Sequence, residues 1–168
     1  AELKEEHIVE YCKGEREFVY LKEFYTAEAY ITDRIGIMRD FGARNSHDFS
    51  AMIAEAERSR GIEYAQLQKE AIQAALSRGL LILTGGPGTG KTTTLNAIIS
   101  LYEKQGFRVM IAAPTGRAAK RISDLTGYDA RTIHRLLEVQ FDPAGGQKFV
   151  HNEENPLECD VLVVDEMS

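Results

Sequence analysis

A glycine-rich turn that ends in a lysine and two threonines carries the clearest chemical signal in the sequence. Residues 85–92 read GGPGTGKT, which fits the pattern G-x-x-x-x-G-K-[ST] of phosphate-binding loops. Glycines let successive backbone N–H groups turn towards phosphate oxygens, and the following helix presents its positive end to the same oxygens. In such loops the lysine places a charge beside the β- and γ-phosphates, and the next hydroxyl holds Mg²⁺. The predicted nucleotide-binding residues are Gly85, Gly86, Pro87, Gly88, Thr89, Gly90, Lys91, Thr92 and Thr93.

An acidic pair, Asp165 and Glu166, directly follows the apolar run 161–164. The carboxyl ends of parallel strands form the rim where ligands bind in open α/β sheets. Asp165 is therefore predicted to hold Mg²⁺ through its water shell, with Thr92 as the second metal-binding residue. Glu166 is predicted to orient and deprotonate the attacking water. Lys91, Asp165 and Glu166 are the predicted catalytic residues.

Short apolar runs alternating with helical stretches are predicted to position these residues. The runs LLILT, FRVMIAAPT and DVLVVDE occupy 80–84, 107–115 and 160–166. Helices are expected over 91–104 and 116–125, so the order is strand, helix, strand, with short turns. This order is typical of a parallel sheet covered on both faces, which predicts an α/β fold of the P-loop NTPase type. A short helix near 133–137 and a hairpin of EVQFD and QKFVH around PAGG are expected before the last run.

The first 60 residues are predicted to form a small helical region. Apolar residues recur at steps of three and four along one face of the first predicted helix: Phe24, Ala27, Ile31, Ile35 and Met38. A second helix is expected over 49–56, capped by Asp48 or Ser46, and a third over 63–77. The predicted organisation is a helical region over 1–60 followed by a nucleotide-binding region over 61–168.

Composition excludes several classes of protein. The chain has 168 residues, of which 43% are apolar and 27% charged, which are ordinary globular values rather than those of a disordered tail, a collagen or a coiled coil. The apolar runs 80–83 and 161–164 are far too short to span a bilayer, and no signal peptide is visible. Cys12 and Cys159 form no disulfide or metal pattern. A reducing, cytoplasmic environment and no membrane partner are expected.

The net charge of −6 taken alone argues against a general nucleic-acid binder. Its distribution is uneven, however. Residues 107–137 carry six basic and two acidic side chains, whereas residues 138–168 carry one basic and eight acidic side chains. A basic block therefore follows the phosphate-binding loop and lies between acidic segments.

Three further stretches resemble motifs of superfamily-one helicases. Residues 68–72, QKEAI, resemble the Q-x-x-A-[IV] element, in which the glutamine amide matches the N6 donor and N7 acceptor of adenine. Residues 113–120, APTGRAAK, look like motif Ia in the form found in RecD-like members, and residues 132–137, TIHRLL, resemble another segment of that group. The ending DEMS, residues 165–168, fits the D-E-x-S form of motif II in the same family, and the stretch 17–31 is similar to the segment that precedes its motor domain. The chain therefore resembles a RecD-like DNA helicase of the exodeoxyribonuclease V alpha-subunit family, stand-alone type.

The resemblance implies a RecA-like motor fold with ATP and Mg²⁺ as cofactors and single-stranded DNA as partner. It adds Gln68 to the ATP-binding residues and implies 5′-to-3′ translocation. It also gives the basic block of residues 107–137 a role, which is contact with DNA. The elements that touch DNA in this family correspond here to Thr115, Gly116, Arg117 and His134. A hydroxyl, backbone N–H groups and a guanidinium suit DNA phosphates.

Several parts of such a motor are missing from the sequence as given. A second RecA-like domain, which carries an arginine worth about 10³ or more in rate, is expected to be needed as a partner. A sheet strand that usually separates the phosphate-loop strand from the motif II strand is also absent, so the parallel sheet is predicted to be incomplete. The chain alone is therefore expected to bind Mg·ATP weakly, hydrolyse it slowly and unwind nothing. Its sheet is expected to leave a gap, to be completed by a longer polypeptide, or to pair with another chain.

Two rival functions remain open at the level of sequence. A phosphate-loop kinase, or another small-molecule phosphotransferase, would share the residues 85–92 but would not need Gln68 or APTGRAA. A non-hydrolysing nucleotide-binding interaction module would fit the chain as it stands. The parent protein is nevertheless expected to be an ATP-hydrolysing DNA helicase.

Overall fold

The computed structural model describes residues 8–13, 15–41, 44–141 and 146–167, which fall into two compact units. One unit comprises residues 1–47 and 77–82, and the other comprises residues 48–76 and 83–168. All the predicted site residues belong to the second unit. Within the described residues, no helix combines the length and the apolar character needed to cross a bilayer.

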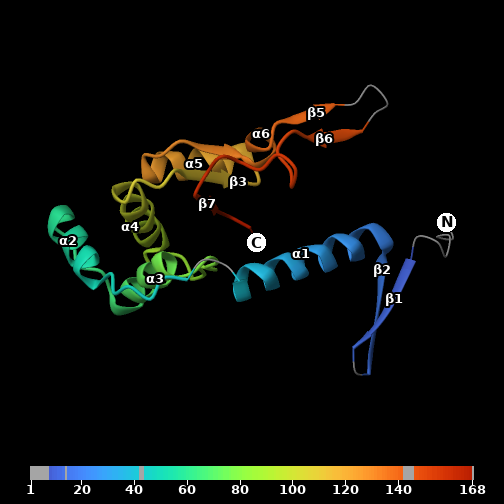
Figure 1. Ribbon diagram of the computed structural model, residues 1–168, viewed down its shortest axis with the longest axis horizontal. Helices are drawn as coiled ribbons and strands as arrows, with labels where there is room; N and C mark the ends of the chain where they lie inside the picture. The colour runs from blue at the N-terminus through green and yellow to red at the C-terminus, as the bar shows by residue number, and fades with distance from the viewer. Residues whose placement is uncertain (1–7, 14, 42–43, 142–145, 168) are drawn as a thin grey trace. The chain divides into compact units, whose positions relative to one another are not determined.

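A β-hairpin and a long helix build the first unit. Strands β1 (Ile8–Lys13) and β2 (Arg16–Leu21) pair antiparallel, with Ile8 opposite Leu21. Helix α1 (Lys22–Phe41) follows directly and confirms the first predicted helix (Figure 1). The hairpin is an addition to the helical region expected here. Its two strands, IVEYCK and REFVYL, are rich in β-branched and aromatic residues but too short for a clear alternating pattern.

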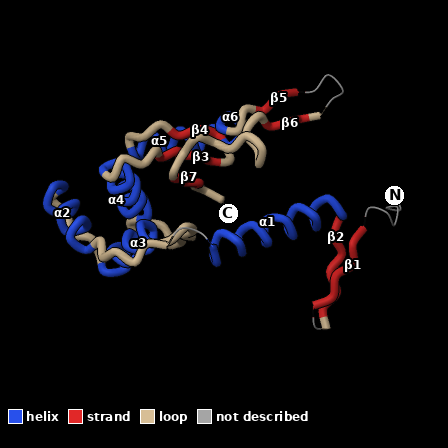
Figure 2. The backbone as a smooth tube through the Cα atoms, viewed as in Figure 1, coloured by secondary structure: helices blue, strands red, loops and turns tan. Residues whose placement is uncertain are grey.

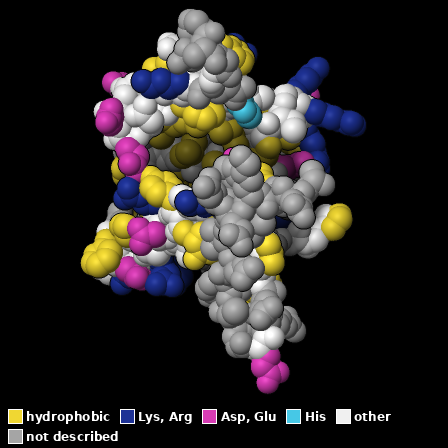
Figure 3. Space-filling view, turned by 90° about the vertical axis from the view of Figure 1, so that its right-hand side faces the viewer, with side chains coloured by type: hydrophobic (Ala, Val, Ile, Leu, Met, Phe, Trp, Pro, Cys, Tyr) yellow, Lys and Arg dark blue, Asp and Glu magenta, His cyan; other side chains and the backbone are white. Residues whose placement is uncertain are grey.

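Many apolar side chains of the first unit remain on the surface. None of the described side chains of α1 is buried, and Phe41 at its end is 83% exposed. Figure 3 shows one face of the molecule, on which hydrophobic side chains lie between charged ones. Helix α1 therefore has an apolar face whose described side chains all remain at least partly exposed.

Two helices at the start of the second unit hold each other through a carboxylate. Helix α2 (Ser50–Arg60) and helix α3 (Gln66–Ser77) match the second and third predicted helices. The N-cap position of α2 is Phe49 rather than Asp48 or Ser46, so the expected cap is wrong, although Asp48 accepts a hydrogen bond from the Ser50 N–H at 2.9 Å. The Glu57 carboxylate of α2 pairs with the Lys69 ammonium at 2.9 Å and accepts the Tyr64 N–H at 2.7 Å. The hydrogen bond from Lys69, followed by that from the Tyr64 backbone, lowers the pKa of Glu57, and these contacts fix the first turn of α3.

A three-stranded parallel sheet forms the centre of the second unit. Its order is β4 (Ala130–Thr132), β3 (Val109–Ala113) and β7 (Val161–Val164). Helices α4 (Lys91–Lys104) and α5 (Gly116–Thr126) confirm the helices predicted on either side of β3 (Figure 2). Ile99 of α4, Ile111 of β3 and Ile122 of α5 are almost fully buried against one another, each burial contributing about 1.5–3 kcal/mol. This cluster fixes both helices to the sheet.

The apolar run before the phosphate-binding loop does not form the predicted strand. Residues 80–84 have no regular structure, and Ile82 is 78% exposed, so the prediction of a buried strand is wrong here. A strand needs a neighbour for its backbone N–H and C=O groups. In the described part of the chain, β7 pairs only with β3, and residues 80–84 pair with no strand. The incomplete sheet that the sequence predicts is confirmed, and the absence of a partner strand explains the irregular run.

The segment between β4 and β7 matches its prediction closely. Helix α6 (Ile133–Leu136) is followed by the antiparallel strands β5 (Val139–Phe141) and β6 (Gln147–Phe149). Residues 142–145, which include most of the expected PAGG turn, lie outside the described residues. Strand β4 was not predicted, because its three residues, ART, are too few to show a pattern.

Candidate functional site

The phosphate-binding loop curls around the ammonium of Lys91. The Lys91 Nζ donates hydrogen bonds to the carbonyl oxygens of Gly85 at 2.5 Å and Gly86 at 2.7 Å. The Thr89 hydroxyl donates to the same Gly86 oxygen at 2.9 Å. Lys91 is also the first residue of α4. The lysine side chain therefore lies where the loop meets the positive end of the helix. This arrangement is suited to a polyphosphate.

Space restricts the first glycine of the loop, Gly85, whereas both space and backbone angle restrict the last, Gly90. A Cβ on Gly85 would lie 2.8 Å from the Thr89 hydroxyl oxygen. Gly90 has φ of +79°, and a Cβ there would overlap the side-chain amide of Gln68. Gly88 has φ of +74° but open space around it. A side chain in place of Gly85 or Gly90 would therefore contact atoms of Thr89 or Gln68 and disturb the loop.

Replacement of Gly90 by alanine is expected to weaken the site more than the same change at Gly88. Both changes place a side chain in the left-handed region, at a cost of about 1–2 kcal/mol. Only Gly90→Ala also displaces the Gln68 amide, which then loses its hydrogen bond to the Gly90 carbonyl oxygen. Chemical denaturation and nucleotide titration of the two variants measure this difference. Equal losses of stability and of nucleotide affinity would show that the Gln68 contact has no effect.

Gln68 joins helix α3 to the phosphate-binding loop. Its Oε1 accepts the Ala65 N–H at 2.9 Å, and its Nε2 donates to the Gly90 carbonyl oxygen at 3.3 Å. The side chain predicted to read adenine therefore lies at the edge of the loop. Its amide is engaged with backbone groups in this structure, so the role of adenine reader stays a prediction.

The predicted Mg²⁺ ligands offer the kind of donors that this ion prefers. Neither the Thr92 hydroxyl nor the Asp165 carboxylate has a hydrogen-bond or ion-pair partner among residues 8–13, 15–41, 44–141 and 146–167. No group of three or more His, Cys, Asp or Glu side chains in that part of the chain is placed to hold a metal by itself. Mg²⁺ in nucleotide sites takes one or two protein oxygens together with phosphates and waters. A hydroxyl and one carboxylate fit this pattern.

Motif II continues directly from strand β7. The Asp165 N–H donates to the Ala112 carbonyl oxygen at 3.0 Å, which extends the pairing of β7 with β3 by one residue. Glu166 then adopts φ of +56°, an unusual angle for a residue other than glycine. Its carboxylate accepts a hydrogen bond from Arg121 Nη1 at 2.5 Å. No hydrogen bond or ion pair joins Asp165 or Glu166 to residues 85–93 within the described chain.

The candidate DNA-contacting residues gather at the carboxyl ends of two paired strands. Ala113 of β3 pairs with Thr132 of β4, so Thr115 and His134 each lie two residues beyond this pair. Gly116 and Arg117 follow Thr115 as the first residues of α5. Val164 pairs with Ala112, which brings Asp165 to the same rim. The sheet thus places motif II and the candidate DNA residues at one edge.

Two of these candidates also have local structural contacts. The Thr115 hydroxyl caps α5 by accepting the Ala118 N–H at 3.2 Å. The His134 ring is exposed and lies 6.1 Å from the Phe149 ring, centre to centre. Arg117 is exposed and has no ion pair within the described residues. DNA contact by these residues stays a prediction.

Arg121 makes a contact at this rim that the sequence did not predict. It was grouped with the basic block, yet its guanidinium pairs with the motif II glutamate 45 residues further along the chain. No local spacing signals such a contact, because it arises only when α5 packs beside β3, the strand that pairs with β7. The structure therefore links α5, the helix that contains the end of motif Ia, to motif II through one ion pair.

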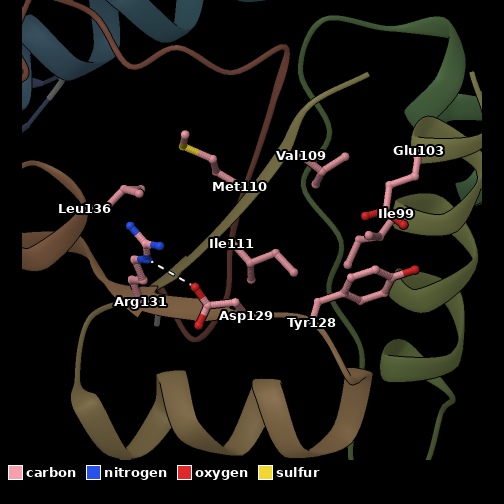
Figure 4. A pocket seen from close by; sticks show the side chains of 9 residues that line it. All are labelled: Ile99, Glu103, Val109, Met110, Ile111, Tyr128, Asp129, Arg131 and Leu136. Carbon is pink, nitrogen blue, oxygen red and sulfur yellow. Dashed lines mark hydrogen bonds and ion pairs between the residues drawn. The ribbon is translucent and has the colours of Figure 1, made fainter. Parts of the chain in front are cut away.

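A cavity of about 290 Å³ lies beside β3 but contains none of the predicted site residues. Its walls come from α4, β3, β4 and α6, and are lined by Ile99, Glu103, Val109, Met110, Ile111, Tyr128, Asp129, Arg131 and Leu136 (Figure 4). Arg131 and Asp129 pair across its rim at 3.1 Å. Burial, with the neighbouring Glu103 carboxylate, raises the pKa of the Tyr128 hydroxyl. No residue of the phosphate-binding loop lines this cavity.

Comparison with known proteins finds a family match over the whole nucleotide-binding segment. Residues 68–168 match the family described as AAA domain. The chain is 49% identical over 89 residues to the ATP-dependent RecD2 DNA helicase of Deinococcus radiodurans, covering 53% of this chain and 12% of that protein. It is 34% identical over 175 residues to the RecBCD enzyme subunit RecD of Mycolicibacterium smegmatis, covering 90% of this chain and 30% of that protein.

A third relative comes from a virus. The chain is 37% identical over 91 residues to the ATP-dependent DNA helicase dda of Enterobacteria phage T4, covering 51% of this chain and 20% of that protein. The chain thus spans between 12% and 30% of the length of these three relatives. The family match, the phosphate-binding loop and the partial parallel sheet agree, so the chain belongs to the AAA domain family and is a RecD-like member of it.

Proposed function

We propose that this chain is the nucleotide-binding part of the first motor domain of an ATP-dependent DNA helicase. The observation that carries the proposal is the phosphate-binding loop closed around the Lys91 ammonium at the start of α4. The printed names of the relatives, which are DNA helicases or a RecD subunit, support the same class of protein. A cytoplasmic location is part of the proposal.

In this proposal the residues of the loop and of motif II divide the work of ATP hydrolysis. The loop N–H groups and Lys91 bind the β- and γ-phosphates, and Gln68 contacts the base. Thr92 and Asp165 would hold Mg²⁺, which supplies charge neutralisation on the phosphates. Glu166 orients a water and takes its proton as the new oxygen–phosphorus bond forms and the bond to the ADP oxygen breaks. The products are ADP and inorganic phosphate.

Single-stranded DNA is the proposed polymer partner. Thr115, Gly116, Arg117 and His134 share a sheet edge with Asp165 through the pairing of β3 with β4 and β7. Hydroxyl, backbone N–H and guanidinium donors suit phosphate oxygens, whereas sequence readout needs base contacts. A binding mode that follows the DNA backbone, with little sequence preference, is expected of a motor that moves along strands. The 5′-to-3′ direction is proposed from the resemblance alone.

A second RecA-like domain is the proposed protein partner. Such a domain carries an arginine that stabilises the charge on the transferring phosphoryl group, worth about 10³ or more in rate. The 168 residues by themselves are therefore expected to bind Mg·ATP weakly and hydrolyse it slowly. The β7 edge and residues 80–84, both unpaired in the described chain, are expected to be completed within the longer protein.

An ATP hydrolysis assay of the full-length protein, with and without single-stranded DNA, tests the proposal. The expected result is Mg²⁺-dependent phosphate release that DNA stimulates. A rival phosphotransferase would instead transfer the γ-phosphoryl group to a small-molecule acceptor, which a screen of acceptors detects. Nucleotide binding with neither phosphate release nor transfer would favour an interaction module.

A further inference from the structure

The ion pair between Arg121 and Glu166 places the proposed catalytic base in contact with the motif Ia helix. The Arg121 Nη1 donates to the Glu166 Oε1 at 2.5 Å. Arg121 lies on α5, and Glu166 lies directly beyond the end of β7 in the left-handed backbone region. Within the described residues this guanidinium is the partner of that carboxylate. The contact therefore determines the direction in which the glutamate points.

The same arginine lies on the helix face predicted to meet DNA. Arg117 and Arg121 are four residues apart on α5, so they project from one face of the helix, one turn apart. Arg117 has no ion pair in the described chain, whereas Arg121 is held by Glu166. A DNA backbone that follows this face would present a phosphate to Arg121 as well. The phosphate and the Glu166 carboxylate would then compete for one guanidinium.

We infer that Arg121 is a positioning residue that couples DNA binding to ATP hydrolysis by holding Glu166 away from the attacking water until a DNA phosphate takes its place. This inference rests on the proposed function. A carboxylate that accepts the Arg121 N–H at 2.5 Å is turned towards α5, whereas a base for hydrolysis has to turn towards the nucleotide. DNA binding frees Glu166 by giving Arg121 another anion.

The exposure of the pair suits a contact that is made and broken in each cycle. The Arg121 and Glu166 side chains are 68% and 46% exposed. Exposed pairs stabilise little and exchange easily, whereas breaking a buried pair leaves an uncompensated charge. The expected effect of the pair on a rate or an affinity is therefore a factor of about 2–5.

The first test measures ATP hydrolysis by the full-length protein carrying Arg121→Gln. The expected result is a DNA-free kcat about 2–5 times that of the wild type, with KM for ATP unchanged and a smaller stimulation by single-stranded DNA. Arg121→Lys, which retains the positive charge, is expected to keep the DNA-free rate near the wild-type value. A merely structural role for Arg121 would lower both rates together and would not raise the DNA-free rate.

A matched control removes an ion pair of similar length and exposure elsewhere. Arg58 pairs with Glu55 within α2 at 2.5 Å, and these side chains are 68% and 61% exposed. Arg58→Gln is expected to change neither the DNA-free rate nor the stimulation ratio. A rise in the DNA-free rate in this variant as well would show that the effect is not specific to Glu166 and would overturn the inference.

The second test measures single-stranded DNA affinity without any need for hydrolysis. If Glu166 and a DNA phosphate compete for Arg121, Glu166→Gln frees the arginine and tightens DNA binding by a factor of about 2–5, because coupling between two sites is reciprocal. In an Arg121→Gln background, Glu166→Gln is expected to have no such effect. Arg121→Gln itself is expected to make the dependence of log affinity on log salt less steep by about 0.7. Fluorescence anisotropy of a labelled oligonucleotide gives all three values.

The outcomes separate this inference from the proposed function. Equal tightening by Glu166→Gln with and without Arg121 would mean general charge repulsion and would overturn the inference. A DNA-free rate in Arg121→Gln at or below the wild-type value would also overturn it, while DNA-stimulated hydrolysis in the wild type would leave the proposed function standing. Failure of the proposed function appears differently, as an absence of Mg²⁺-dependent hydrolysis in the wild type with and without DNA.

Discussion

Replacement of Lys91 by alanine is expected to lower the kcat for ATP hydrolysis by about 10²–10³, the effect of removing one preorganised donor from a developing charge. The Lys91 ammonium lies inside the phosphate-binding loop, bonded to the carbonyl oxygens of Gly85 and Gly86. In the proposed mechanism, its loss removes the positive charge that stabilises the γ-phosphate, and it also removes the group around which the loop is closed. Steady-state hydrolysis by the full-length protein, with saturating single-stranded DNA, measures the effect.

A second lysine of the same helix provides the control for Lys91. Lys104 lies in the last turn of α4, thirteen residues from Lys91 and at the opposite end of the helix. Lys104→Ala is expected to leave hydrolysis within about twofold of the wild type, since exposed surface changes have small effects. Hydrolysis that survives Lys91→Ala at the wild-type rate would mean that another site performs the reaction.

Replacement of Glu166 by glutamine is expected to lower kcat by about 10²–10⁴, the usual contribution of a positioned general base. The change preserves the shape of the side chain but removes the carboxylate that, in the proposed mechanism, accepts the proton of the attacking water. Nucleotide affinity is expected to stay unchanged, because the loop, Lys91 and Asp165 are untouched. Single-turnover hydrolysis together with equilibrium binding of a nucleotide analogue separates the two quantities.

The control for Glu166 is an exposed glutamate in the same acidic segment. Glu158 is 87% exposed and lies 3.6 Å from Arg108 in a surface ion pair. Glu158→Gln is expected to leave kcat unchanged, since such pairs contribute little. A loss of nucleotide affinity in Glu166→Gln that accounts for the whole loss of rate would contradict the role of general base.

Much of the fold follows from patterns in the sequence that are long enough to read. Helix α1 repeats its apolar positions over several turns, helices α4 and α5 lie between apolar runs and short turns, and β3 and β7 are such apolar runs. The hairpin of β5 and β6 follows from two short strand-like runs around Pro and Gly. In each case the local pattern and the tertiary packing agree.

The elements that the sequence mispredicted depend on neighbours rather than on local pattern. Residues 80–84 have the apolar composition of a buried strand, but no strand in the described chain lies beside them to accept their backbone hydrogen bonds. Strand β4, with only three residues, forms because Ala130–Thr132 lies beside β3. Local sequence carries no information about either circumstance.

The candidate site divides in the same way. The phosphate-binding loop was predictable residue by residue, because each glycine and Lys91 has a chemical reason to be at its position. The side-chain contacts of Gln68 with Gly90, and of Arg121 with Glu166, were not predictable, since each joins positions more than 20 residues apart. These contacts are what connect the loop to α3 and motif II to α5.

The most direct test of the central claim is strand displacement by the full-length protein on partial duplexes with 5′ or 3′ single-stranded ends. With Mg·ATP, we expect the wild-type protein to release the displaced strand from the duplex with the 5′ end. We expect the Lys91→Ala variant to release no strand from it. No displacement from either duplex, by a protein that still binds Mg·ATP and transfers its phosphoryl group to a small molecule, would contradict it.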